Sequence, residues 1–304
     1  MPFPNLHDVT VDLETLHGDL HAYVPHGFVV MVEHWVLLIA LSKILGEILF
    51  LFYQQLGKQP TLTQFEDLEA QLNAFMITEP QATDQSAVVT FSYYHLQLHL
   101  RATLITFYRP FVSSTPRGLS AAAEIAWSTR VRSCMESAAT QANAVLDCIA
   151  REGLVKFATP MTPPLLVPAM HVHLLGCKSE NHLTRRLAFN KLEMCMIVMR
   201  ELQKTHTSAS IFCGVFGEAI RQLLPGPFDE SVWGVAQIRR PSTAGTTSQD
   251  SAQTVNLFDS ALQPIVTDDV LESLLNETSS YNYWESFNMP DQAFVTFDRQ
   301  QFNV

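Results

Sequence analysis

Glycine-rich phosphate loops and nucleotide-binding fingerprints are absent from this sequence. Its 12 glycines are scattered along the chain, and none forms the G-x-G-x-x-G pattern that holds a pyrophosphate. No serine, histidine and aspartate stand together in an arrangement typical of a hydrolase. We therefore expect a protein that is not an enzyme.

Cysteine and basic residues are also scarce. The five cysteines are odd in number and none has the C-x-x-C spacing, which excludes a disulfide framework and a zinc site. Reduced thiols in an intracellular protein are the expected state. The net charge of −11 argues against direct DNA binding, because DNA binding needs lysine and arginine to displace counterions from phosphates.

The sequence has no signal peptide, because its first residues, MPFPNLHDVTVDLE, lack a basic region and an apolar run. Its most apolar segment, Phe28–Tyr53, is interrupted by Glu33, His34, Lys43 and Glu47. A membrane span needs about 20 predominantly apolar residues. We therefore predict a soluble protein without a membrane partner.

The segment Phe91–Val112 predicts a helix with two opposed apolar stripes. One stripe contains Phe91, Tyr94, Leu98, Ala102 and Ile105, and the other contains Tyr93, Leu96, Leu100, Leu104 and Phe107. Two stripes require packed partners on both sides. We expect a central buried helix that ends near Tyr108 or Arg109, because Pro110 cannot continue it.

The pattern elsewhere predicts an all-α, multi-helix domain around this central helix. Further helices are expected at Phe28–Tyr53, from a capping box at Thr63–Glu66 to about Phe75, and at Leu119–Arg151, Ala169–Cys177, His182–Lys204 and Ala209–Leu224. Residues 1–27 are predicted to be an irregular lead-in, 28–233 the domain and 234–304 a disordered acidic tail. From Pro241 onward there are nine acids and one base, so residues 241–304 carry −8 of the −11.

Two histidines of the central helix, His95 and His99, have the one-turn spacing of a helical metal pair. A zinc protease would need glutamate between them at position 96, which is Leu96. We favour buried, hydrogen-bonded histidines, and an effector cavity beside them and Arg101 is the alternative. Arg109 either contacts a ligand or caps the last carbonyls of the central helix, and we favour the cap.

Three stretches resemble one known family. Phe107-Tyr108-Arg109-Pro110-Phe111 resembles the middle homology region of fungal zinc binuclear-cluster transcription factors, nearest the cutinase and fatty-acid-response regulators. The stretch from Leu41 to Ile48, LSKILGEI, is similar to the first helix of that region. Ala188, Leu192 and Cys195 are spaced as in its closing helices.

This resemblance implies the regulatory and activation portion of a fungal RNA polymerase II transcription factor. It implies a nuclear location, transcriptional coactivators as partners, a homodimer and a small effector. The family's six-cysteine cluster, which binds zinc and DNA, is missing from these residues. No cofactor is therefore expected in this chain, and DNA contact is expected only through such a module or a partner protein.

The acidic tail contains the candidate activation residues. They are Asp268, Asp269, Val270, Leu271, Leu274, Leu275, Trp284 and Phe287. The two aspartates suit the first turn of a short helix, and the leucines form a stripe that a partner's groove would bind. The alternatives are a degraded linker or a last helix docked on the domain.

Two other interpretations remain open at this stage. Asp268, Asp269 and Glu272 match the magnesium motif of an all-α terpene cyclase, but a second acidic motif is missing. A non-activating scaffold or dimerisation module would leave the tail inert. Arg239 and Arg240 precede Ser242 as in sites of basophilic kinases, so Ser242 is a candidate phosphosite.

Overall fold

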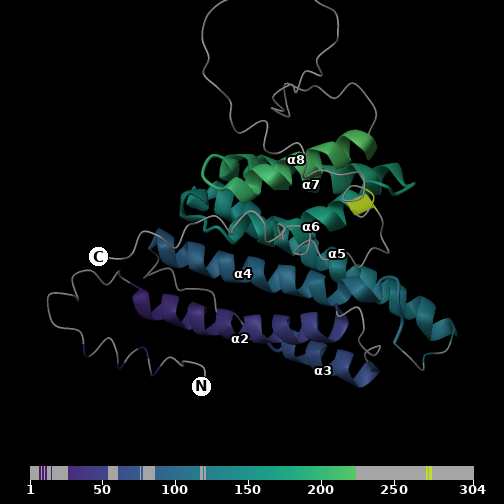
Figure 1. The fold of residues 1–304 in the computed structure, drawn as a ribbon, viewed down its shortest axis with the longest axis horizontal. Helices are drawn as coiled ribbons and strands as arrows, with labels where there is room; N and C mark the ends of the chain where they lie inside the picture. Colours follow the sequence, from purple (N-terminus) through teal and green to yellow (C-terminus); the bar gives the residue numbers. More distant parts are fainter. Residues whose placement is uncertain are drawn as a thin grey trace, which may run out of the picture.

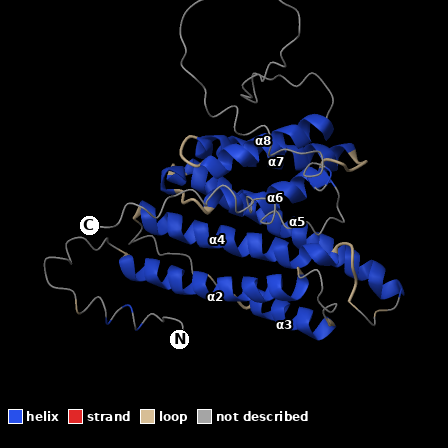
Figure 2. Ribbon diagram, in the orientation of Figure 1, coloured by secondary structure: helices blue, strands red, loops and turns tan. Residues whose placement is uncertain are grey.

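The computed structural model describes residues 27–53, 61–75, 77, 86–116, 119 and 121–223, together with His7, Val9, Val11, Thr15, Glu272, Leu274 and Leu275. Within these residues it contains seven α-helices and two 3-10 helices, and no strand (Figure 2). The predicted all-α class is confirmed for this part of the chain. His7, Val9 and Val11 are helical, although we expected an irregular lead-in.

The helices are close to the predicted ones. They are α2 (Phe28–Phe52), α3 (Leu62–Asn73), α4 (Ala87–Tyr108), α5 (Ala121–Arg151), α6 (Thr162–Gly176), α7 (His182–Gln203) and α8 (Thr207–Leu223). The 3-10 helices η2 (Arg109–Phe111) and η3 (Leu154–Phe157) follow α4 and α5. Gly153, at a left-handed φ of 66°, turns the chain out of α5 as predicted.

Helix α4 packs against α2 on one side and against α5 and α6 on the other (Figure 1). Beyond α6 lie α7 and then α8. Both predicted stripes of α4 contribute buried side chains, such as Leu98 from one and Phe107 from the other. α4 begins at Ala87, four residues before the predicted start, because Ser86 caps it by accepting a hydrogen bond from the Val89 N–H.

The capping box of α3 lies two residues before the predicted one. Thr61 accepts a hydrogen bond from the backbone of Gln64, whose side chain accepts from the Thr61 N–H. The motif T-x-x-Q satisfies the same two donors as the T-x-x-E that we chose at Thr63–Glu66. Both motifs fit the sequence here, and the earlier one begins the helix.

Helix α6 begins seven residues before the predicted Ala169. Pro163 and Pro164 occupy its first turn. Proline is tolerated there, because backbone N–H groups of the first turn have no hydrogen-bond partner inside a helix and the N–H that proline lacks is not needed. Pro168 lies inside the helix, one residue before the predicted start. An interior proline costs about 3 kcal/mol. Twelve of the fifteen residues of α6 are buried, and this burial outweighs that cost.

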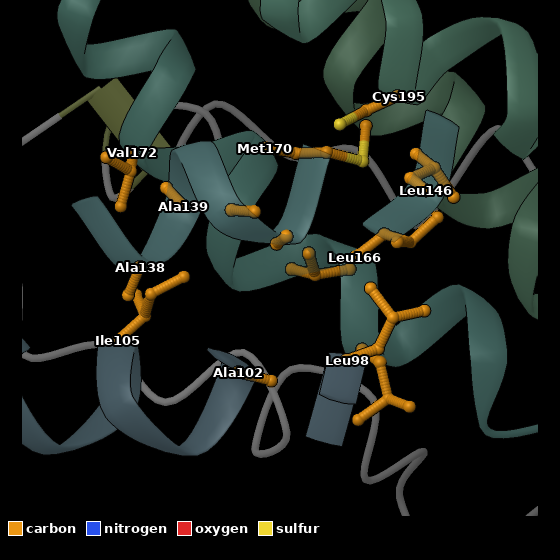
Figure 3. Close-up of a cluster of buried hydrophobic side chains, with 14 of the residues drawn as sticks. Leu98, Ala102, Ile105, Ala138, Ala139, Leu146, Leu166, Met170, Val172 and Cys195 are labelled. Carbon is orange, nitrogen blue, oxygen red and sulfur yellow. The ribbon is translucent and has the colours of Figure 1, made fainter. Parts of the chain in front are cut away.

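The core is formed where four helices meet. Figure 3 shows Leu98, Ala102 and Ile105 from α4, Ala138, Ala139 and Leu146 from α5, Leu166, Met170 and Val172 from α6, and Cys195 from α7. Alanines of α5 pack in this core against α4. α6 and α7 also approach closely, because a Cβ added at Gly176 would lie 2.8 Å from the Cβ of Ala188.

Helix α2 buries apolar side chains on its inner side and exposes both apolar and charged side chains on its outer side. Leu41 and Ile48 are buried, and the His34 Nδ1 lies 2.7 Å from the Ser92 Oγ of α4. On the outer side Trp35 and Phe50 are 47% and 65% exposed. By length and composition α2 could cross a membrane, and 11% of its most apolar stretch is buried. The sequence analysis predicted that the charged residues of α2 rule out a membrane span, but α2 still qualifies as a candidate span by length and composition.

Candidate functional site

The candidate activation residues lie mostly outside the described part of the chain. Asp268, Asp269, Val270, Leu271, Trp284 and Phe287 are among those outside, as is the candidate phosphosite Ser242. Leu274 and Leu275 are described, together with their neighbour Glu272, and all three have helical backbone. We call these three residues the docked segment.

The docked segment packs against the helical domain through one leucine. Leu274 is 1% exposed and belongs to the hydrophobic core, although about fifty residues of sequence separate it from α8. Leu275 is partly buried against the same core, and Glu272 is exposed. In Figure 1 the segment is the short yellow piece beside α6. One of the predicted activation leucines is therefore covered by the domain, as the alternative of a last helix docked on the domain predicted.

Two side chains of α6 and its C-terminal extension hold the backbone of the docked segment. The Nε2 of His171 donates a hydrogen bond to the carbonyl oxygen of Leu274 at 3.0 Å. The Nζ of Lys178 donates to the carbonyl oxygen of Leu275 at 2.5 Å. His171 lies inside α6, and Lys178 lies in the turn just after the C-cap Cys177. The sequence analysis predicted neither of these two contacts.

His171 is a neutral hydrogen-bond donor at this site. Burial lowers its pKa well below the usual value, and the positive charge of Arg109 lowers it further. The hydrogen bond to Leu274 acts in the opposite direction on that pKa and is the weaker effect. A neutral imidazole has one N–H, and the carbonyl of Leu274 can only accept, so the hydrogen is on Nε2.

Arg109 is the first residue of η2 and lies near the buried ring of His171 and the partly buried ring of Tyr53. Its charge lowers the pKa of His171 on α6 and opposes the rise in pKa that burial causes at Tyr53. The carbonyl of Thr106, near the end of α4, accepts a hydrogen bond from the Tyr53 hydroxyl at 2.8 Å. Tyr53 thus takes part in capping α4, where our prediction named Arg109 alone.

His95 and His99 face each other on α4 with their ring centroids 4.8 Å apart. The Nε2 of His95 lies 3.3 Å from the Thr159 hydroxyl. Burial lowers the pKa of each histidine to about 4, and His99 also lowers that of His95. Both rings are therefore neutral near pH 7. Among the described residues, no group of three or more histidine, cysteine or acidic side chains could hold a metal ion.

Arg101 hydrogen-bonds to a residue one turn earlier on the same face of α4. Its guanidinium donates to Gln97 at 3.2 Å, and the Gln97 amide lies 3.4 Å from the Tyr93 hydroxyl. Burial lowers the pKa of Arg101. His95 instead faces Thr159. The effector cavity beside these side chains stays a prediction.

A polar network that includes an ion pair links α3, α4 and α5. Glu69 of α3 accepts a hydrogen bond from the Tyr108 hydroxyl of α4 at 2.8 Å and from the Arg130 guanidinium of α5 at 2.5 Å. Glu69 is 8% exposed. We call these three residues the Glu69 network. It joins elements far apart in sequence, which no local pattern can predict.

A second polar network links α5, α6 and α7. The Asn143 amide donates to the Lys191 carbonyl at 2.8 Å and accepts from the His173 Nε2 at 2.7 Å. Burial and the nearby Lys191 lower the pKa of His173 to about 4. The Cys195 thiol lies 3.5 Å from the same amide oxygen. Each group of this network has a partner, so it is a structural link between helices.

The arrangement of these residues is suited to binding. Burial raises the pKa of Cys177 to about 11 and that of Cys195 to about 12, so neither thiol is a nucleophile near pH 7. The most specific arrangement is the capture of a leucine and two neighbouring carbonyls by α6. Comparisons of this chain with protein-family models, with curated proteins and with solved structures find no significant match.

Proposed function

We propose that this chain is the regulatory and activation portion of a fungal RNA polymerase II transcription factor. It acts in the nucleus and contacts coactivators through its tail, and it reaches DNA through a zinc-cluster module or a partner protein. The observation that carries the proposal is the burial of Leu274 on the helical domain. A domain that buries a leucine of an acidic segment is suited to control when that segment is accessible to a coactivator.

The sequence supports the same proposal. The stretches around Phe107–Phe111, Leu41–Ile48 and Ala188–Cys195 resemble the middle homology region of this family. Acidic residues around leucines and aromatics, as in the tail, suit a segment that folds on contact with a partner's groove. A small effector that acts on the domain would complete the regulation.

The test is a reporter fusion of residues 255–304 to an unrelated DNA-binding domain. We expect activation, and we expect it to fall when Leu271, Leu274 and Trp284 are replaced by alanine while every acid is kept. A fusion with three serines of the tail replaced by alanine is the matched control. Full activity in the leucine and tryptophan variant would show that charge alone activates.

We further propose that α4 is the centre of the regulatory domain. Leu98 and Leu100 belong to opposite stripes and are 0% and 5% exposed. Leu98→Asp and Leu100→Asp should each cost at least about 4 kcal/mol, because each loses burial and places an unpaired charge in the core. Circular dichroism melts measure this. A melt like that of the wild type in either variant would mean that one stripe does not need its partners.

Ser242 is proposed as a regulatory phosphosite, on the strength of Arg239 and Arg240 before it. Phosphate would add about −1.5 to −2 charge beside these arginines. Mass spectrometry of protein from growing cells should find the modified residue in some growth condition. An unmodified Ser242 in every condition refutes this part of the proposal.

Two exposed apolar side chains of α2, Trp35 and Phe50, favour a second function, that of a dimerisation scaffold. Large apolar side chains left exposed on one helix are suited to contact with a second copy. Light scattering should find a dimer that dissociates in Trp35→Ser/Phe50→Ser. The control is Glu33→Gln/Lys43→Gln, which changes only charges on α2. A monomeric wild type refutes this function.

A further inference from the structure

We infer that the surface of α6 around His171 and Lys178 is a binding site for a short leucine-bearing helix. The occupant in this structure is the chain's own docked segment, Glu272, Leu274 and Leu275. We further infer that this occupancy withholds Leu274 from a partner until the segment leaves. The binding site stands on the contacts alone, whereas the regulatory consequence rests on the proposed function.

The side-chain part of the recognition is the burial of a single leucine. Leu274 is 1% exposed, while Glu272, two residues before it, is exposed. Leu275 packs against the same core only partly. A helix that docks on a surface shows this alternation, because one face enters the contact and the other stays in water. The site therefore selects a large apolar side chain at one position of the helix.

The backbone part of the recognition consists of two donors for two adjacent carbonyls. His171 reaches the Leu274 carbonyl and Lys178 reaches the Leu275 carbonyl. The Lys178 ammonium places its positive charge beside the Leu275 carbonyl oxygen, which makes this hydrogen bond charge-assisted. These donors contact main-chain atoms and are indifferent to side-chain type. Any short helix that places a leucine at this position satisfies the same requirements.

Two features make the contact suitable for exchange. Lys178 is exposed, so one of the two hydrogen bonds lies at the solvent boundary. Docking is also intramolecular, so a partner must compete with a segment that is always nearby. Leu274 cannot be buried on α6 and in a partner's groove at the same time. Docking and partner binding are therefore mutually exclusive for this residue.

The experiment uses the full chain and a fluorescent synthetic peptide of residues 266–278, with binding measured by fluorescence anisotropy. The wild-type chain should bind the peptide weakly, because its own segment occupies the site. Leu274→Ala vacates the site and should bind the peptide at least 10-fold more tightly. Glu272→Ala, a change at the exposed neighbour, should bind as the wild type does.

A second peptide, with alanine in place of its leucine at position 274, tests the specificity. It should bind none of the three chains. Equal affinity of the wild-type and Leu274→Ala chains for the first peptide would overturn the inference. Equal affinity of the Leu274→Ala chain for the two peptides would overturn it as well.

Lys178→Glu decides the matter if Leu274→Ala does not fold, because Lys178 is exposed and its replacement leaves the core intact. Thermolysin cleaves before exposed leucines, and mass spectrometry reads cleavage at Leu274. We expect cleavage at least 10-fold faster in Lys178→Glu than in the wild type, and no change in Glu272→Ala. Unchanged cleavage in Lys178→Glu would overturn the inference.

The reporter assay separates the regulatory consequence from the proposed function. The full chain fused to a DNA-binding domain should activate more strongly when it carries Lys178→Glu. If the isolated tail activates and Lys178→Glu changes nothing, the regulatory consequence is wrong. If the isolated tail is silent while the peptide binds as expected, the proposed function fails and the binding site stands.

Discussion

Replacing Glu69 by glutamine tests how strongly the Glu69 network attaches α3 to the rest of the domain. Glutamine keeps the length and one acceptor oxygen of glutamate, so the hydrogen bond from Tyr108 can persist. The charge is lost, and with it the ion pair to Arg130. Because the Glu69 side chain is 11% exposed, that pair lies mainly in a water-poor environment on the glutamate side.

The magnitude follows from the exposure of the two partners. A hydrogen bond to a charged group contributes about 1.5–3 kcal/mol. The Arg130 side chain is 49% exposed, and solvent-exposed ion pairs contribute about 0–1 kcal/mol. We therefore expect Glu69→Gln to lower the free energy of unfolding by about 1–2 kcal/mol. For a domain of this size, that corresponds to a decrease in Tm of roughly 2–8 °C.

Urea unfolding followed by circular dichroism measures this free energy. The matched control is Glu66→Gln, on the exposed side of the same helix, which should change it by less than about 0.5 kcal/mol. A double-mutant cycle of Glu69→Gln with Arg130→Met should give a coupling of about 1 kcal/mol. Equal effects of the two glutamine variants, together with zero coupling, would refute the reasoning.

Three further predictions concern titration, packing and reactivity. His95 and His99 are held neutral at a pKa of about 4 against 6.5 when unfolded, so the unfolded state binds their protons first as pH falls. The free energy of unfolding should thus decrease as pH falls from 6.5 to 4, by on the order of 1 kcal/mol per histidine at pH 5 after solvent screening. Urea melts at several pH values measure this, and the variant His95→Gln/His99→Gln should show a smaller decrease. Gly176→Ala should lower the free energy of unfolding by about 1–3 kcal/mol, because its Cβ would lie 2.8 Å from another Cβ. Gly217→Ala, whose Cβ would have no atom within 4 Å, should instead stabilise α8. A higher Tm for Gly176→Ala than for Gly217→Ala would contradict this packing. Cys195 should resist iodoacetamide in the native protein and react once urea unfolds the protein, since burial raises the pKa of this thiol to about 12. Labelling of native Cys195 at the rate of a free thiol would disprove this.

The helices could be predicted from the sequence where their signals are local. The helical period of α4 and the left-handed Gly153 after α5 depend only on neighbouring residues, and both are present in the structure. The errors arose where two local signals competed. Thr61 and Thr63 both begin capping motifs, and Pro168 resembles a helix stop until the burial of α6 is known.

The candidate site was beyond prediction for a different reason. The leucine stripe of the tail was visible, but a stripe only states that a helix needs a partner. Whether that partner is another protein or α6 depends on contacts across about one hundred residues, such as the bond from His171 to Leu274. The Glu69 network is non-local in the same way. Sequence patterns identify such groups as polar or apolar and leave their partners unspecified.

The nearly complete burial of α6 has a consequence for hydrogen exchange. Amide protons at Met170 and Leu174, whose side chains are 0% exposed, can meet solvent only after α4, α5 and α7 have separated from α6. Their exchange rates therefore report the global free energy of unfolding, while amides near helix ends report local fraying. Pro168 has no amide proton, so the amides of α6 fall into one group before it and one group after it. Equal exchange free energies in the two groups would show that the domain opens as one cooperative unit.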